Sequence, residues 1–103
     1  MSIMFSVDKP IYVTRAIAEE LPGEHQLFIY QYFWNQQEVM TDYLQVFNFY
    51  IEDGHQFVIQ SQEQPERETI MKVPLQKQEP IERTVWMMDQ GEDGTIILFP
   101  NDY

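Results

Sequence analysis

The chain has no cysteine and only two histidines and four glycines among its 103 residues. The lack of cysteine excludes disulfides, thiolate metal sites and cysteine nucleophiles. Four scattered glycines leave no glycine-rich phosphate loop, and no serine stands in a G-x-S-x-G elbow. His25 and His55 do not form a metal-binding spacing, and we expect both at the surface. These absences predict no catalytic residues, no metal and no cofactor, so we do not expect an enzyme.

Basic side chains are also scarce. Six Lys and Arg stand against 17 Asp and Glu, which gives a formal net charge of −11. Binding to nucleic acid or to an anionic membrane requires Lys or Arg to neutralise phosphates, so neither is expected as a direct partner. Excess negative charge favours solubility. An alternative is an acidic decoy that occupies a nucleic-acid-binding protein.

Long hydrophobic runs are missing as well. The longest nearly continuous apolar segment, Leu27–Trp34, is far shorter than the roughly 20 residues that span a bilayer. The segment before Asp8 has no basic stretch typical of a signal peptide. We therefore expect a cytoplasmic protein that forms a single domain over residues 1–103, with a lead-in segment at 1–10.

The hydrophobic pattern predicts an α+β fold. One main aromatic-rich helix is expected at 22–38, after a single helical turn at 16–21. It is expected to pack on one face of an antiparallel sheet of about five strands, in the order β-α-β-β-β-β. The expected strand segments are 11–15, 43–51, 55–62, 83–89 and 95–99, with 69–73 as a further short candidate.

The dipeptide Asp53-Gly54 marks a hairpin between two alternating segments. A two-residue loop would set Phe49 opposite Val58. A loop of odd length would instead place Phe49 on the same face as Phe57. Because a slip of one residue moves every side chain to the other face, we favour the odd loop, with Gly54 in a left-handed bulge position.

The segment "LFIYQYFW" (27–34) contains five aromatic residues in eight positions. On a helix, its apolar residues leave only about a quarter of the circumference polar, whereas a surface helix on a sheet needs an apolar stripe only a little over 100° wide. A sheet can cover roughly half of such a helix, so something else should cover the remainder. The remaining cover could come from residues 1–15 or 64–80, from a second copy or protein partner, or from a ligand in a groove lined by the aromatic rings. Lipid is the poorest candidate, because the polar side carries Glu rather than Lys or Arg. The candidate partner-binding residues are Phe28, Tyr30, Tyr32, Phe33 and Trp34.

A second candidate site is polar. The two hairpin strands bring residues 42–45 close to 61–66, and an arginine from 11–15 could pair with a carboxylate there. Such a cluster has the groups needed to recognise an extended peptide at a sheet edge. Its alternative is an ordinary hydrogen-bonded anchor for a loop. The candidate residues are Arg15, Tyr43, Gln45, Gln62 and Glu63.

Five short motifs follow one another along the chain: "YVTR" (12–15), "DYLQVF" (42–47), "SQEQPE" (61–66), the segment 86–89, and "LFPNDY" (98–103). In these motifs the chain resembles a family of small acidic bacterial domains of unknown function. The resemblance implies a bacterial or phage-borne cytoplasmic protein. It implies no activity, cofactor or catalytic residue.

The expected function is a non-enzymatic protein-interaction module that associates with itself or with a protein partner through the aromatic helix. The acidic decoy is the first alternative. A small hydrolase or metal-dependent enzyme is the second, and it requires His25 or His55 to approach carboxylates in a concave pocket.

Overall fold

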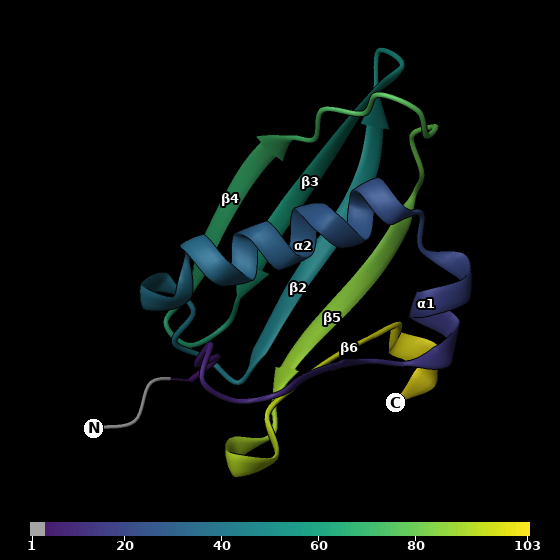
Figure 1. Ribbon diagram of the computed structural model, residues 1–103. Coiled ribbons are helices and arrows are strands. Elements are labelled where there is room, and N and C mark those ends of the chain that lie inside the picture. The colour runs from purple at the N-terminus through teal and green to yellow at the C-terminus, as the bar shows by residue number, and fades with distance from the viewer. Residues whose placement is uncertain (1–3) are drawn as a thin grey trace.

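The computed structural model describes residues 4–103 and contains one sheet of six strands, with the helices on one side (Figure 1). The strands lie in the order β1-β6-β5-β2-β3-β4. The predicted α+β class is therefore confirmed, although the sheet has six strands rather than about five. The strands are β1 Ile11–Val13, β2 Leu44–Glu52, β3 His55–Gln62, β4 Arg67–Lys72, β5 Arg83–Asp89 and β6 Thr95–Leu98.

Two α-helices precede the long strands. The first, α1 Arg15–Glu20, is capped by the Thr14 hydroxyl, which accepts from the N–H of Ile17 at 3.2 Å and donates to the Asp102 carboxylate at 2.8 Å. The second, α2 Gly23–Asn35, lies across the front of the sheet (Figure 1). It is shorter than the predicted 22–38, because the chain leaves it for a short 3₁₀ turn, η1 Gln37–Val39. Two more such turns are η2 Gly91–Asp93 and η3 Pro100–Asp102.

The sheet is mixed, whereas the sequence predicted a wholly antiparallel one. β1 is parallel to β6, and the other neighbouring strands are antiparallel. Gly94 makes the approach of β1 to β6 possible: its φ is 104°, and a Cβ there would lie 2.1 Å from the carbonyl oxygen of Pro10. That carbonyl also accepts from the N–H of Thr95 at 2.9 Å. This pairing joins segments far apart in sequence, so no local pattern predicts it.

The hairpin between β2 and β3 differs from the favoured prediction. Its loop has two residues, Asp53 and Gly54, both with positive φ (51° and 77°), as a type I′ turn requires. Phe49 is therefore opposite Val58, and Phe57 lies on the other face of the sheet. The prediction of an odd loop was wrong because it assumed that the alternating glutamines of β3 face solvent. These glutamines are buried on the side of the sheet that faces the helix.

The hydrophobic core lies between α2 and the sheet. Phe47 and Phe49 of β2 are fully buried there, together with Ile29 of α2. Phe5 of the lead-in segment and Leu75 of the loop after β4 also pack into this core. The chain itself thus covers part of the aromatic helix, as in one of the predicted alternatives. Residues 1–3 of the lead-in lie outside the described part of the chain.

The other side of the sheet, which we call the open face, is covered by neither α1 nor α2 (Figure 1). Strand alternation gives it a largely apolar surface of half-buried and exposed side chains. Tyr103 packs edge-on against Trp86 there, with ring centroids 6.0 Å apart. The apolar strand residues of this face are Tyr12, Leu44, Val46, Tyr50, Phe57, Ile59, Ile70, Trp86, Met88, Ile96 and the buried Leu98.

Candidate functional site

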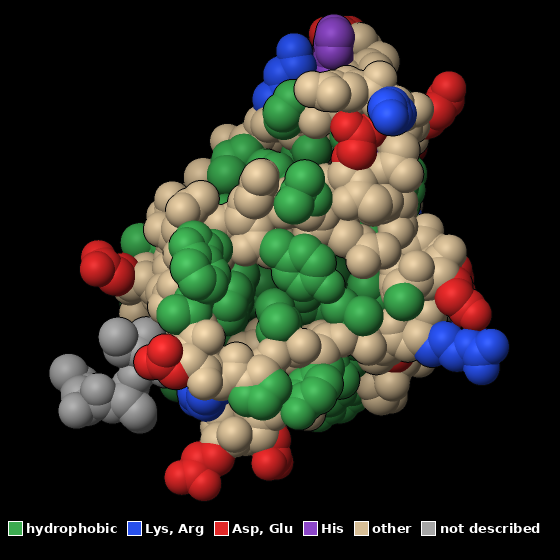
Figure 2. All heavy atoms as spheres, viewed as in Figure 1, with side chains coloured by type: hydrophobic (Ala, Val, Ile, Leu, Met, Phe, Trp, Pro, Cys, Tyr) green, Lys and Arg blue, Asp and Glu red, His purple; other side chains and the backbone are tan. Residues whose placement is uncertain are grey.

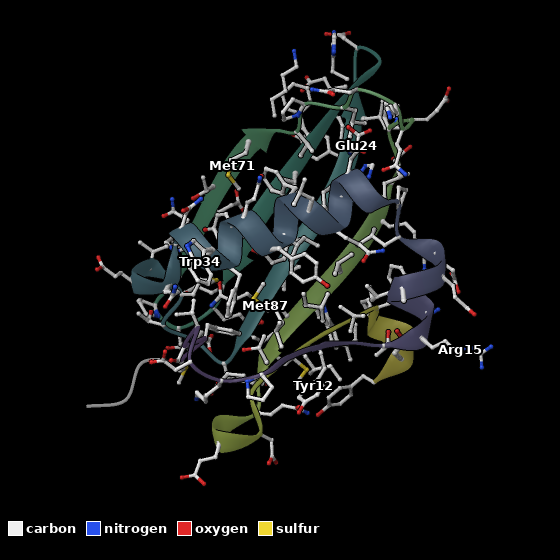
Figure 3. The ribbon with its side chains drawn as sticks, viewed as in Figure 1. Tyr12, Arg15, Glu24, Trp34, Met71 and Met87 are labelled. Atoms are coloured by element: carbon white, nitrogen blue, oxygen red, sulfur yellow. The ribbon has the colours of Figure 1, made fainter. Side chains whose placement is uncertain are left out.

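Two adjoining hollows separate α2 from β4 and the chain that follows it. Their volumes are about 480 Å³ and about 210 Å³, and both are lined by Phe28 and Gln31 of α2. We call the pair the α2–β4 groove. Figure 3 labels Met71 on the β4 wall and Glu24 at the N-terminal end of α2. The other lining residues are Glu24, Leu27, Val73, Pro74 and Gln76 in the first hollow, and Tyr32, Asn35, Gln36 and Met71 in the second.

β4 is an edge strand, and half of its backbone groups point away from the sheet. The N–H of Val73 donates to the carbonyl of Gln56 at 2.9 Å. In an antiparallel ladder the hydrogen-bonded pairs alternate, so Met71 and Thr69 are also directed toward β3. The backbone groups of the intervening residues, Glu68, Ile70 and Lys72, therefore face outward. The side chain of Ile70, at the middle of this edge, is 60% exposed.

A buried polar network fixes both walls of the groove to the sheet. Gln60 of β3 is fully buried, and its Oε1 accepts from the Tyr32 hydroxyl of α2 at 2.7 Å and from the Arg67 guanidinium of β4 at 2.8 Å. Its Nε2 donates to Oε1 of Gln45 at 2.7 Å, and Gln45 in turn donates to Gln62 at 2.8 Å. Each buried amide is thus satisfied by a neighbour, as burial of polar groups requires.

The carboxylate of Glu24 closes the N-terminal end of the groove. It accepts from three consecutive backbone N–H groups, those of Gln76, Lys77 and Gln78, at 2.7–2.9 Å. In addition, Oε1 of the Gln78 side chain accepts a hydrogen bond from the backbone N–H of Glu24. The hydrogen bond from the N–H of Gln76, followed by those of Lys77 and Gln78, holds the pKa of Glu24 below its usual value of 4.5. We call this arrangement the Glu24 clasp.

The clasp predicts a pH-dependent contribution to stability. A lowered carboxyl pKa in the folded protein adds stability above the unfolded value of about 4.5, and this contribution is lost as the pH falls through the folded pKa. Glu24→Gln should therefore unfold at lower urea concentration than the parent at pH 7. The difference between the two should shrink as the pH is lowered toward about 3.

The control for the clasp is Glu79→Gln, which removes an exposed carboxylate from the same loop. Its urea midpoint should follow that of the parent at every pH. A Glu24→Gln variant that matched Glu79→Gln throughout would show that the clasp adds nothing to stability.

The two histidines lie in different environments. His25 is fully buried, not at the surface as predicted, because α2 presses its first turn onto β2 and β3. Its Nε2 lies 2.8 Å from Oε1 of Gln56, and its ring packs edge-on against Phe49. His55 is exposed beside the hairpin turn, as predicted. Within residues 4–103 no group of three or more metal-binding side chains occurs.

The structure separates the predicted aromatic residues into three kinds. Tyr32 and Phe33 are 8% and 6% exposed, so they point into the fold and are not free to meet a partner. Phe28 is half-buried and lines the groove, whereas half-buried Tyr30 packs toward α1 and β6. Trp34 is 64% exposed on the outer side of α2 (Figure 3). The outward surface is smaller than the sequence indicated.

The predicted polar cluster assembles in part. Gln45 and Gln62 meet, but they are buried and bonded to each other. Tyr43 and Glu63 are exposed near the same end of the sheet. Arg15 is not part of the cluster, because it lies on α1 and pairs with Glu19 at 3.0 Å. The glutamines thus act as a structural anchor for the strands.

Three features of the groove were missed by the sequence reasoning. Arg67 lies in an acidic stretch, and no sequence pattern predicted that its guanidinium would contact Tyr32 of α2 and Gln60 of β3. The open edge of β4 follows from the order of the strands in the sheet. That order depends on pairing between segments far apart in sequence, which no local pattern predicts. Glu24 did give a signal, since an acidic residue in the first turn of a helix is favourable, but its contact with the loop after β4 has no sequence pattern.

The fold and the groove define an α+β domain in which one helix crosses a six-stranded mixed sheet and leaves an edge strand open. Residues 11–101 match the family described as "Staphylococcal protein of unknown function (DUF960)". The chain belongs to this family, which confirms the predicted resemblance to a bacterial family of unknown function.

A crystal structure of a protein of unknown function from Enterococcus faecalis has the same fold. Its TM-score is 0.85 over 100% of this chain and 98% of the other, with 20% sequence identity. None of the curated proteins matches the chain. Within residues 4–103, no helix combines the length and the apolar content that crossing a bilayer needs. Neither the family description nor that of the structural neighbour names an activity.

Proposed function

We propose that this domain is a non-enzymatic protein-interaction module that binds an extended segment of a partner protein in the α2–β4 groove. The observation that carries the proposal is the open edge of β4, where the backbone groups of Glu68, Ile70 and Lys72 face outward beside the groove. Main-chain groups at a sheet edge recognise a strand and leave side-chain pockets to select its sequence.

The lining of the groove defines the chemistry of that segment. Phe28 and Met71 offer apolar contacts from opposite walls, and Gln31 offers an amide that can donate and accept. Alternate residues of an added strand point to the same side, so every second residue of the ligand should be apolar. The net charge of −11 favours a ligand that also carries Lys or Arg, because opposite charge speeds encounter.

The exposed apolar residues of α2 support this use of the groove in part. Leu27 is 54% exposed and lines the groove. Trp34 follows it by two helical turns, about 10 Å further along the helix, but it lines neither hollow. The apolar area that α2 offers to a bound segment therefore comes from Leu27 and Phe28.

The acidic-decoy alternative receives less support. A decoy needs carboxylates gathered on one face, whereas on the side shown in Figure 2 the acidic side chains are scattered around the periphery. They are also spread along the chain, over helices, strands and turns: Glu19 lies in α1, Glu68 in β4 and Glu92 in η2.

The test uses a displayed library of random peptides of about ten residues, long enough to pair with the edge and extend past it. We expect enriched peptides to alternate apolar residues and to bind with a dissociation constant near 10 μM. Ile70→Pro removes an outward N–H without removing a ladder bond to β3. It should weaken binding about tenfold, which corresponds to one well-formed hydrogen bond.

The matched control is Ile70→Thr, which keeps the N–H and a β-branched side chain and should bind nearly as well as the parent. Leu27→Glu, an exposed change on the opposite wall, should also weaken binding. The proposal fails if no peptide is enriched, or if Ile70→Pro and Leu27→Glu both bind as tightly as the parent.

A further inference from the structure

The open face of the sheet lies on the side away from α1 and α2 (Figure 1). The α2–β4 groove is lined by side chains of α2 and therefore lies on the helix side. Register places Val46 of β2 beside Trp86 of β5, and Ile59 of β3 beside Ile70 of β4. The residues between these pairs on the same face, Asn48 and Ser61, are polar but neutral. The interior of the face therefore presents a continuous uncharged surface across the strands.

Charge is nearly absent from this face in a chain that is otherwise strongly acidic. Among the strand residues of this face, the carboxylates are Glu52 of β2 and Glu68 of β4, and Lys72 and His55 lie on the same β2–β4 half. The described strand residues of β5 and β6 on this face are apolar or neutral, and Trp86 is among them. Depletion of charge and the presence of a large aromatic residue are features of the core of a protein interface.

The size of the face fits a small interface. The six strands have 3, 9, 8, 6, 7 and 4 residues. At a rise of roughly 3.3 Å and a spacing of about 4.8 Å they cover about 600 Å² in projection. The accessible area of protruding side chains is larger than this projection and approaches the roughly 800 Å² per partner of a standard interface. An interface at this lower end is expected to be weak and reversible.

We infer that two copies of this chain associate through their open faces, sheet against sheet, with the helices on the outside. A second copy fits this surface because each face is apolar and neutral at its centre, so no carboxylate is forced into the contact. Packed sheets in this arrangement bury alternate residues of both inner faces, as in a β-sandwich. Near the β4 end, the single Lys72 of one copy has Glu68 or Glu52 of the other as an available counter-charge. The α2–β4 groove is on the other side and stays free, so this inference is independent of the proposed function.

Salt dependence distinguishes this self-association from binding to a basic partner. Two copies that each carry −11 repel one another, and salt screens that repulsion. The association should therefore strengthen when NaCl is raised from about 50 mM to about 500 mM. Binding to a basic protein through the carboxylates would weaken over the same range.

The experiment is analytical ultracentrifugation of the full chain from about 5 μM to about 500 μM. We expect a weak dimer with a dissociation constant near 10–100 μM, inside this range. The 12.4 kDa monomer should convert reversibly to a dimer. The double variant Val46→Thr with Ile59→Thr keeps β-branched side chains while adding hydroxyls at the centre of the face. It should weaken the dimer at least tenfold.

The matched control replaces exposed apolar residues on the helix side, Leu27→Gln with Trp34→Gln, and should leave the dimer constant unchanged. Circular dichroism and the urea midpoint of each variant show that the fold is kept. The inference is overturned by a chain that stays monomeric over the whole range, by an open-face variant that dimerises like the parent, or by loss of the dimer in the helix-side control. Each of these results leaves the peptide-binding test unaffected, so the two proposals fail separately.

Discussion

Replacing Phe49 with alanine should lower the free energy of unfolding by about 3–5 kcal/mol. Phe49 is buried between β2 and α2, and its ring packs against His25 with centroids 5.2 Å apart. The change removes a large apolar side chain and leaves a cavity that the surrounding sheet fills only in part. Because a domain of this size is stable by only about 5–15 kcal/mol, the loss is a large fraction of the total.

Phe57→Ala is the matched control for Phe49→Ala. Phe57 lies on the open face, half-buried and stacked on Tyr50 at 5.7 Å, so its removal should cost only about 1–2 kcal/mol. Urea unfolding followed by circular dichroism in dilute solution measures both. Equal losses, or a larger loss for Phe57, would support the odd hairpin loop and contradict the two-residue loop.

Gln60→Met should lower the free energy of unfolding by about 2–4 kcal/mol, although methionine is similar in size and more apolar. The loss arises because the substitution leaves two hydrogen-bond donors without their acceptor. Without the amide, the Tyr32 hydroxyl loses its acceptor at 2.7 Å and the Arg67 guanidinium loses its shortest bond, at 2.8 Å. A buried donor without a partner costs more than the apolar replacement gains, and most so for a charged donor.

The control for Gln60→Met is Gln90→Met, the same change at an exposed turn position. It should shift the unfolding free energy by no more than about 0.5 kcal/mol. A double variant, Gln60→Met with Arg67→Met, should recover part of the loss, since it removes both the amide and the charge that depended on it. If Gln60→Met were as stable as Gln90→Met, the polar network would not be holding the two walls of the groove.

The elements themselves were largely predictable from the sequence. The strands at 55–62 and 83–89 have the predicted bounds, because period-two alternation is a local signal that follows directly from strand geometry. The main helix was also found, and its end was placed three residues too late. Aromatic residues alone did not indicate where α2 gives way to the 3₁₀ turn at Gln37–Val39.

The face of the sheet that is buried was not predictable from hydrophobicity. In β3 one face carries His55, Phe57, Ile59 and Ser61, and the other carries Val58 among three glutamines. Counting apolar residues selects the first face for the core. The glutamine face is nevertheless the buried one, because Gln60 and its neighbours satisfy one another and meet groups from α2 and β4 that are distant in sequence. The strand propensities of single residues do not predict such a network, because burial of each amide is favourable only when the others are in place to bond to it.

One wall of the candidate site was predictable from the sequence and the other was not. Phe28 was identified from the helix pattern, and it lines the groove. The opposite wall depends on β4 being an edge strand, which follows from the pairing of β1 with β6 and of β2 with both β3 and β5. Local signals thus located the helix side of the groove, and only the tertiary arrangement located the other side.

The parallel pairing of β1 with β6 has a consequence for the order in which the sheet assembles. Within the described residues β1 pairs with β6 alone, and the N-cap residue Thr14 is bonded to Asp102, 88 positions later. The β2–β3–β4 meander has short connections, so its pairings close small loops and we expect them to form early. The pairing of β1 with β6 closes a much longer loop, and we expect it to form late. Until then β6 is an unprotected edge, to which a strand of another chain could add.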